Sequence, residues 1–142
     1  MKRYMSILLI LAIACAFSAS VVVAAEYETH DFDGKFKMDV YTGCDFDEDE
    51  NQGVISYTDL DKHMSVIYLE DSSITPTMSE SDLQAFKDTS GFVDDGTEGD
   101  IHMYKKGSAY GAMVIDDGII VVVLSNVRED ALDMAKSIEF TD

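Results

Sequence analysis

The chain has 142 residues, of which 28 are Asp or Glu and 10 are Lys or Arg, so its formal net charge is −18. This length suits one domain with a short appendage. The excess of negative charge repels the phosphates of nucleic acids and the anionic headgroups of a membrane, which argues against both as partners. The negative charge can keep the protein soluble, or it can attract cations or a basic partner.

The N-terminal appendage has the pattern of a secretory signal peptide. Lys2 and Arg3 form a basic start, residues 5–25 carry no charge, and small residues suited to signal peptidase precede Glu26. The alternative is an uncleaved membrane anchor, because about 20 uncharged residues can span a bilayer. The basic end stays in the cytoplasm in both cases. We therefore expect residues 26–142 to form a single acidic domain that is secreted or extracytoplasmic, touching a membrane only through an uncleaved N-terminus.

Two hairpins are predicted in the first half of this domain. Residues 27–41 carry the turn signal Asp33-Gly34 and then alternate apolar and polar side chains, which predicts a hairpin with one solvated face. Strands over 54–58 and 63–69 predict a second hairpin. An acidic loop is predicted before it, at 45–53.

The second half is predicted to begin with a helix and a loop. Ser79 can cap a short helix over 79–90, with Asp82 as the acidic residue at its third position. A second acidic loop is predicted at 94–99, followed by a strand at 101–104.

The end of the chain is predicted to contain a hairpin over 108–126 and a last helix. Residues 119–124 are apolar and almost all β-branched, so this strand is predicted to be central and buried on both faces. The sequence at 126–129 has the pattern of a capping box, which predicts a helix that runs to about residue 138.

The predicted fold class is therefore α+β, with a largely antiparallel sheet of about six to seven strands and two helices packed on it. Short turns can join every neighbouring pair of strands, which is why the sheet is expected to be antiparallel. The double burial of residues 119–124 requires a helix on each face, or a helix on one face and long connections on the other.

Two segments resemble the PsbP/Mog1-like group of extracytoplasmic α+β domains. They are Phe-Lys-Met-Asp-Val-Tyr-Thr-Gly at 36–43 and the closing stretch at 131–140. The resemblance covers most of the predicted domain and implies that group's α+β fold, as an alternative to a plain two-layer sandwich. It implies no catalytic residues, because the group shares none, and its members are mostly binding or assembly domains.

One set of residues has the spacing of metal ligands. Asp45, Asp47, Asp49 and Asn51 place side-chain oxygens at alternate positions, as at the start of a calcium loop. The Gly and Glu that such a loop needs at its sixth and twelfth positions are missing. The plain interpretation is a solvated acidic loop, and the alternative is weak binding of Ca²⁺ or another divalent cation. No other cofactor is expected.

No catalytic motif stands out in the sequence. Cys44 is the one cysteine after residue 25, so it has no internal disulfide partner, and its acidic neighbours are expected to raise its pKa. We expect an exported, non-enzymatic domain that binds a protein or a cell-envelope component. The alternatives are a divalent-cation-binding module acting through residues 45–51, and a small hydrolase with dispersed catalytic residues, which a deep pocket lined by a histidine–carboxylate pair would favour.

Overall fold

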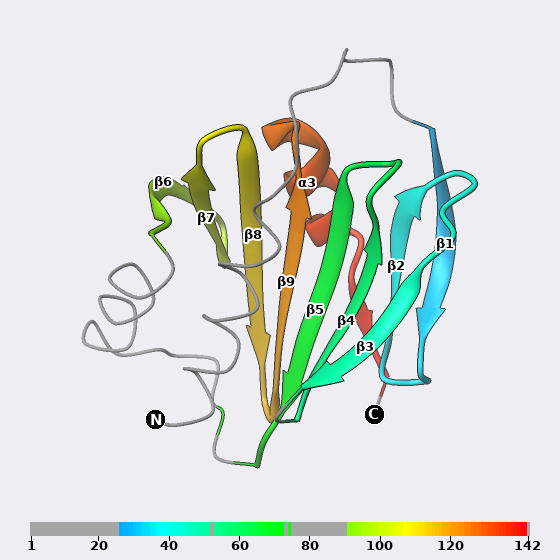
Figure 1. Ribbon diagram of the computed structural model, residues 1–142. Helices are drawn as coiled ribbons and strands as arrows, with labels where there is room; N and C mark the ends of the chain where they lie inside the picture. The colour runs from blue at the N-terminus through cyan, green and yellow to red at the C-terminus, as the bar shows by residue number, and fades with distance from the viewer. Residues whose placement is uncertain (1–25, 52, 73, 75–90, 142) are drawn as a thin grey trace.

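A computed structural model of the chain describes residues 26–51, 53–72, 74 and 91–141 (Figure 1). These residues form ten strands and one helix. Strands β1 (Tyr27–Phe32), β2 (Phe36–Tyr41) and β10 (Glu139–Phe140) form a small antiparallel sheet in the order β1-β2-β10. The predicted hairpin at 27–41 is confirmed, since β1 and β2 pair in register around the turn at Asp33-Gly34.

The other seven strands form one large antiparallel sheet. They are β3 (Asp47–Asn51), β4 (Val54–Asp59), β5 (Met64–Glu70), β6 (Val93–Glu98), β7 (Ile101–Lys106), β8 (Ala109–Asp116) and β9 (Ile119–Ser125). Their order in the sheet is β3-β4-β5-β9-β8-β7-β6. The predicted hairpins β4–β5 and β8–β9 are confirmed by continuous pairing.

The predicted fold class was wrong. The described part of the chain is mostly β, with two sheets and the single helix α3 (Arg128–Lys136), in place of one sheet of six to seven strands carrying two helices. The acidic segments predicted as loops at 45–53 and 94–99 contribute the edge strands β3 and β6. Backbone pairing with β4 and β7 outweighs their low strand propensity, because an edge strand needs no apolar face. The helix predicted at 79–90 lies outside the described residues.

Strand β9 lies at the centre of the large sheet, as its apolar run predicted. It is the fourth strand of seven, and every one of its residues is buried. Val121 and Val123 belong to the core that the large sheet shares with α3 and the small sheet. Ile120, Val122 and Leu124 belong to a second core on the opposite face, together with Phe92.

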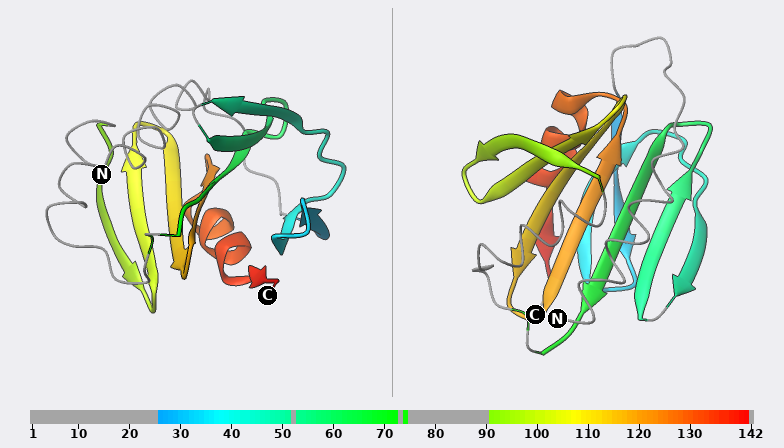
Figure 2. Two further views of the ribbon diagram at one scale, coloured as in Figure 1. Left: turned by 90° about the horizontal axis from the view of Figure 1, so that it is seen from below. Right: turned by 60° about the vertical axis from the view of Figure 1, so that its left-hand side comes forward.

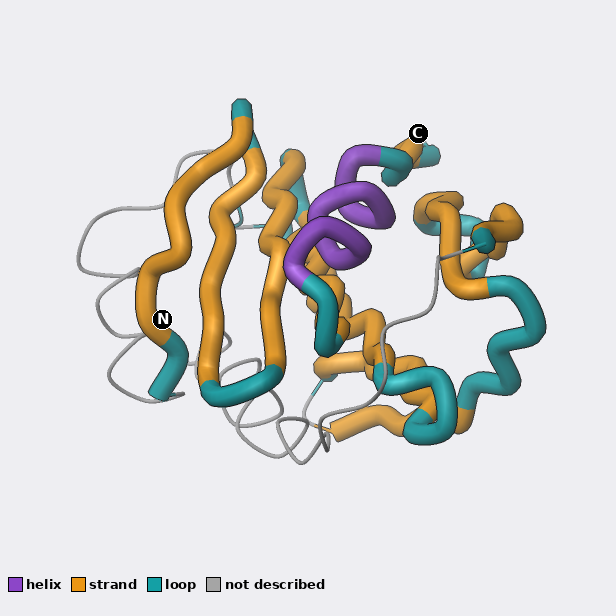
Figure 3. The backbone as a smooth tube through the Cα atoms, turned by 90° about the horizontal axis from the view of Figure 1, so that it is seen from above, coloured by secondary structure: helices purple, strands orange, loops and turns teal. Residues whose placement is uncertain are grey.

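The large sheet curves around α3, and the small sheet lies on the far side of the helix (Figures 2 and 3). The helix buries Ala131, Leu132, Met134 and Ala135 and contacts β7, β8, β9 and β2. It ends at Lys136, two residues earlier than predicted. Ser137 follows and ties this end to the small sheet, since its Oγ donates to the Met134 carbonyl and accepts from the Asp39 N–H at 2.7 Å. Among the described helices, none has the length and apolar character needed to cross a membrane.

The start of α3 differs from the predicted capping box. The residue before the helix is Val127, in an extended conformation, and no side chain caps the first turn. The side chain of Ser125 instead accepts a hydrogen bond from the Val127 N–H at 3.1 Å. A buried serine at the end of β9 therefore orders the chain where the strand passes into the helix.

Two tyrosine–carboxylate junctions fasten the small sheet to the rest of the fold. At the Asp33 junction, Asp33 Oδ2 accepts hydrogen bonds from the hydroxyls of Tyr57 and Tyr68, both at 2.5 Å. The rings of these two tyrosines stack with centroids 6.5 Å apart. Asp33 belongs to the β1–β2 turn and the tyrosines to β4 and β5, so this junction joins the two sheets.

The Asp130 junction repeats the arrangement at the start of α3. Asp130 Oδ2 accepts from the Tyr41 hydroxyl at 2.6 Å, and its Oδ1 accepts from the Tyr27 hydroxyl at 3.2 Å. The Tyr41 hydroxyl also lies 2.7 Å from Ser125 Oγ. The two tyrosine rings stack with centroids 6.0 Å apart. This junction therefore joins the small sheet to α3 and to the end of β9.

Candidate functional site

The predicted metal ligands lie along an edge of the large sheet. Asp47, Asp49 and Asn51 are in β3, opposite Thr58, Ser56 and Val54 of β4. They share one face of the sheet because side chains alternate along a strand. Asp45 precedes the strand, and its backbone N–H donates to Asp59 Oδ2 at 2.8 Å.

The extended strand holds these oxygens apart. Side chains on one face of a strand repeat every two residues, a separation of about 6.6 Å along the backbone. Ca²⁺ instead needs oxygens at roughly 2.3–2.6 Å from a single ion. Within the described part of the chain, no group of three or more His, Cys, Asp or Glu side chains is placed to hold a metal ion. Asp45, Asp47, Asp49 and Asn51 are thus aligned along an edge and do not surround a common centre.

The β3 edge (residues 47–51) is acidic and regular, and β4 is the only described strand that pairs with it. All five residues are exposed, and each pairs with β4 without a bulge. Glu48 and Glu50 lie on the face opposite to Asp47 and Asp49, so both faces of the edge carry carboxylates. Alternate residues of an antiparallel edge strand direct their backbone N–H and C=O groups away from the sheet. The β3 edge therefore combines negative charge with backbone groups that can pair with a further strand.

The opposite edge of the large sheet, β6, is built differently. Its pairing with β7 shifts register between Asp94 and Thr97, and Gly96 between them has a φ of 95°. Asp95 is engaged by Arg128, whose Nε donates to Asp95 Oδ2 at 2.7 Å. Bulges and inward ion pairs of this kind prevent an edge from pairing with another chain. Of the two edges, the β3 edge is the one with a regular ladder.

The environment of the β3 edge contains tyrosine and charged side chains. Burial, followed by the hydrogen bond to Asp33, raises the pKa of Tyr57, and the negative charge of Glu48 adds to that shift.

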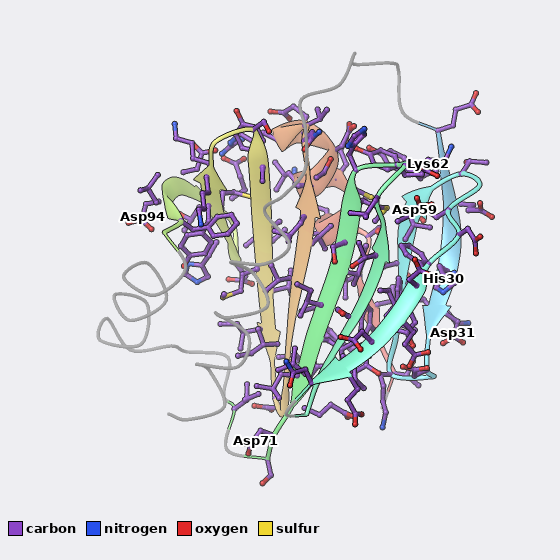
Figure 4. All side chains as sticks on the ribbon, viewed as in Figure 1. His30, Asp31, Asp59, Lys62, Asp71 and Asp94 are labelled. Atoms are coloured by element: carbon purple, nitrogen blue, oxygen red, sulfur yellow. The ribbon has the colours of Figure 1, made fainter. Side chains whose placement is uncertain are left out.

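Asp59 and Lys62 lie at one end of the large sheet and Asp71 lies at the other (Figure 4). Asp59 accepts from the backbone N–H groups of Asp45 and Lys62, so this carboxylate orders the chain that leads into β3.

The three histidines, His30, His63 and His102, do not form a cluster. His30 is in β1 and packs its ring against Phe32 and Phe46, with centroid distances of 4.6 and 5.3 Å. His63 precedes β5 with a φ of 54°, so it belongs to a turn and not to the strand predicted for it. His102 is in β7. The structure therefore places each histidine on a different element.

Cys44 is a half-buried thiol whose Sγ lies 3.3 Å from Met64 Sδ. Its pKa is raised to about 12, mainly by burial and then by the charge of Asp59. The sequence predicted a raised pKa from the acidic neighbours, whereas burial is the larger cause. A thiol with such a pKa is almost entirely protonated near neutral pH and is a poor nucleophile.

Comparison with protein-family models gives no match to this chain, and comparison with curated proteins gives none either.

Proposed function

We propose that the chain is an exported, non-enzymatic binding domain whose β3 edge takes up an extended, basic segment of a protein or cell-envelope component. The observation that supports this proposal is the regular acidic strand, exposed at all five residues, at the edge of the large sheet. An extended peptide can add to such an edge through backbone hydrogen bonds, and its side chains then determine specificity.

Charge determines which kind of segment fits. A strand added beside β3 presents its side chains alternately to Asp47 and Asp49 on one face and to Glu48 and Glu50 on the other. Opposite charges directly across a pair of strands are favourable and like charges are unfavourable. A second copy of β3 would place carboxylates against carboxylates, so a strand rich in Lys or Arg is the suitable occupant.

The proposal can be tested with a seven-residue peptide that carries Lys at alternate positions and Thr or Val between them. We expect saturable binding that weakens with added salt, together with slower hydrogen exchange of β3 amides in the complex. An Asp47→Asn/Asp49→Asn variant should bind about tenfold more weakly, because each cross-strand charge pair contributes roughly 0.2–1 kcal/mol.

The matched control is an Asp100→Asn/Asp133→Asn variant. It changes the net charge equally, at exposed positions on the β6–β7 turn and on α3. If both variants bind the peptide equally weakly, the loss of affinity comes from overall charge, and this result would contradict a site on β3. Absence of peptide binding, with self-association of the Asp47→Asn/Asp49→Asn variant, would show that the acidic edge only prevents aggregation.

A further inference from the structure

A second feature of the fold, independent of the β3 edge, is a cleft between the two sheets. It has a volume of about 360 Å³ and lies where the β8–β9 turn, the end of β5, the β1–β2 turn and β10 meet. Its lining residues are Lys35, Glu70, Asp116, Asp117, Gly118, Ile119, Phe140 and Thr141. Volumes of this order are typical of sites for small ligands or single side chains.

The walls of the cleft are held by backbone contacts from distant parts of the chain. The Thr141 N–H donates to the Lys35 carbonyl at 2.9 Å, which fixes the C-terminal stretch beside the β1–β2 turn. The Gly118 carbonyl accepts from the Asp71 N–H at 2.9 Å, and the Gly118 N–H donates to the Ile74 carbonyl at 3.0 Å. The β8–β9 turn is thereby fixed against the chain that follows β5, so the cleft is a formed feature of the fold.

The charges in the cleft favour a cation. Three carboxylates and one ammonium group line the cleft, and the ammonium group, Lys35 Nζ, lies 3.2 Å from Glu70 Oε1. Asp116 and Asp117 form no hydrogen bond or ion pair through their side chains with any residue that the structure describes. Two negative charges at the cleft are therefore not neutralised by the described residues, and an anionic ligand is disfavoured.

The apolar lining indicates what kind of cation fits. Ile119 is almost fully buried and Phe140 is half-buried, and both line the same cleft as the two aspartates. An aliphatic chain can pack against these side chains, and an aromatic face attracts an ammonium group. A bare metal ion gains nothing from such a surface, and the carboxylates are not clustered in the way that a metal site requires.

We propose that this cleft binds a primary alkylammonium group, with the cation at Asp116 and Asp117 and the aliphatic chain against Ile119 and Phe140. The group can come from a free aliphatic amine or from a lysine side chain of a protein. Glu70 stays paired with Lys35.

The test uses two probes, 1,4-diaminobutane and Nα-acetyl-lysine methylamide, titrated into the isotopically labelled protein at constant ionic strength. We expect saturable changes in the amide resonances of Gly118, Ile119 and Thr141, with no such change when sodium chloride replaces the amine. An Asp116→Asn/Asp117→Asn variant should lose about tenfold in affinity, from two lost charge pairs at a partly exposed site. Tighter binding of one probe assigns the source of the ammonium group.

The Asp100→Asn/Asp133→Asn variant is again the matched control, because it removes the same charge outside the cleft. Resonance changes that do not saturate, or affinities that fall equally in both variants, would overturn the proposal. The outcome is separable from that at β3, since the affected amides belong to the β8–β9 turn and the C-terminal stretch and not to residues 47–51.

Discussion

Replacing Asp33 with Asn tests whether a charged carboxylate holds the two sheets together. Asp33 accepts two tyrosine hydroxyls at 2.5 Å and has a φ of 57°, a conformation that Asn also tolerates. The substitution therefore removes the charge without straining the backbone. A hydrogen bond to an ionised group contributes about 1.5–3 kcal/mol, and a neutral one about half as much. Because Asp33 lies at the surface, we take the lower value for each bond and expect a loss of about 1.5 kcal/mol.

The dependence of this loss on pH identifies its cause. The hydroxyls of Tyr57 and Tyr68 hold the pKa of Asp33 below its ordinary value of 3.8. Since the pKa is lower in the folded protein, the stabilisation is present above 3.8 and is lost as the pH falls through the folded value. Urea unfolding should therefore show a gap between the natural protein and the Asp33→Asn variant that is largest near neutral pH and shrinks below pH 3.8.

An Asp100→Asn variant is the control, since it removes one exposed carboxylate for which the structure describes no hydrogen bond. Its unfolding free energy should change by less than about 0.5 kcal/mol. If Asp33→Asn costs no more than this control near neutral pH, or if its cost does not vary with pH, the junction does not act through the charge of Asp33.

Two further predictions concern groups whose pKa values the fold raises. Burial raises the pKa of Tyr104 to about 12. The pKa values of four other tyrosines are raised further, by burial together with nearby carboxylates, and these are Tyr27, Tyr41, Tyr57 and Tyr68. The stability that these neutral tyrosines contribute is therefore present below about pH 10 and is lost as the pH rises further. An ultraviolet titration should show them ionising above the ordinary pKa of tyrosine, about 10, and at the same pH as the protein unfolds. Cys44 should react with iodoacetamide far more slowly in the folded protein than in urea, as followed by mass spectrometry. Equal rates in the two conditions would contradict its burial.

The sequence carries the strongest signal where a strand has an apolar face. The run at 119–124 predicted a central strand, and β9 is the central strand of seven. The hairpins over 27–41 and 108–126 were also predicted, and the glycines in their turns, Gly34 and Gly118, have positive φ values of 73° and 78° that favour glycine. Local patterns of this kind specify a hairpin through its own residues, so no information about the rest of the fold is needed.

The acidic edges were missed for a physical reason. All five residues of β3 are exposed, so no periodic apolar pattern marks it as a strand. Its extended conformation comes from pairing with β4, which a local reading of residues 45–53 does not include. This is one reason why the fold class was wrong, since counting β3 and β6 as loops removed two strands from the large sheet. The separation of β1, β2 and β10 into a second sheet depends on pairing between residues 36 and 140, and local pattern does not encode this.

The carboxylates that stabilise the fold could not be selected from 28 acidic residues by spacing. Asp33 and Tyr68 are 35 residues apart, and Asp130 and Tyr27 are 103 apart. Neither pair has a local signature, because the contacts exist only once the small sheet has docked. The residues predicted as metal ligands had a local signature, and the structure spreads them along one edge.

The structure divides the acidic residues into two groups with opposite effects on stability. Some carboxylates accept hydrogen bonds from named donors, and Asp33, Asp59, Asp95 and Asp130 are examples. Others lie at the β3 edge or the cleft and accept none from the described residues, and they are Asp47, Asp49, Asp116 and Asp117. Neutralising the first group weakens bonds within the fold, which for Asp33 and Asp130 are the bonds that fasten the small sheet. Neutralising the second only relieves repulsion within a chain of net charge −18, so it should leave the folded state as stable or more stable. The carboxylates of the second group are not used by the described part of the fold, so the β3 edge and the cleft are the two places where the proposed binding of cations is to be tested.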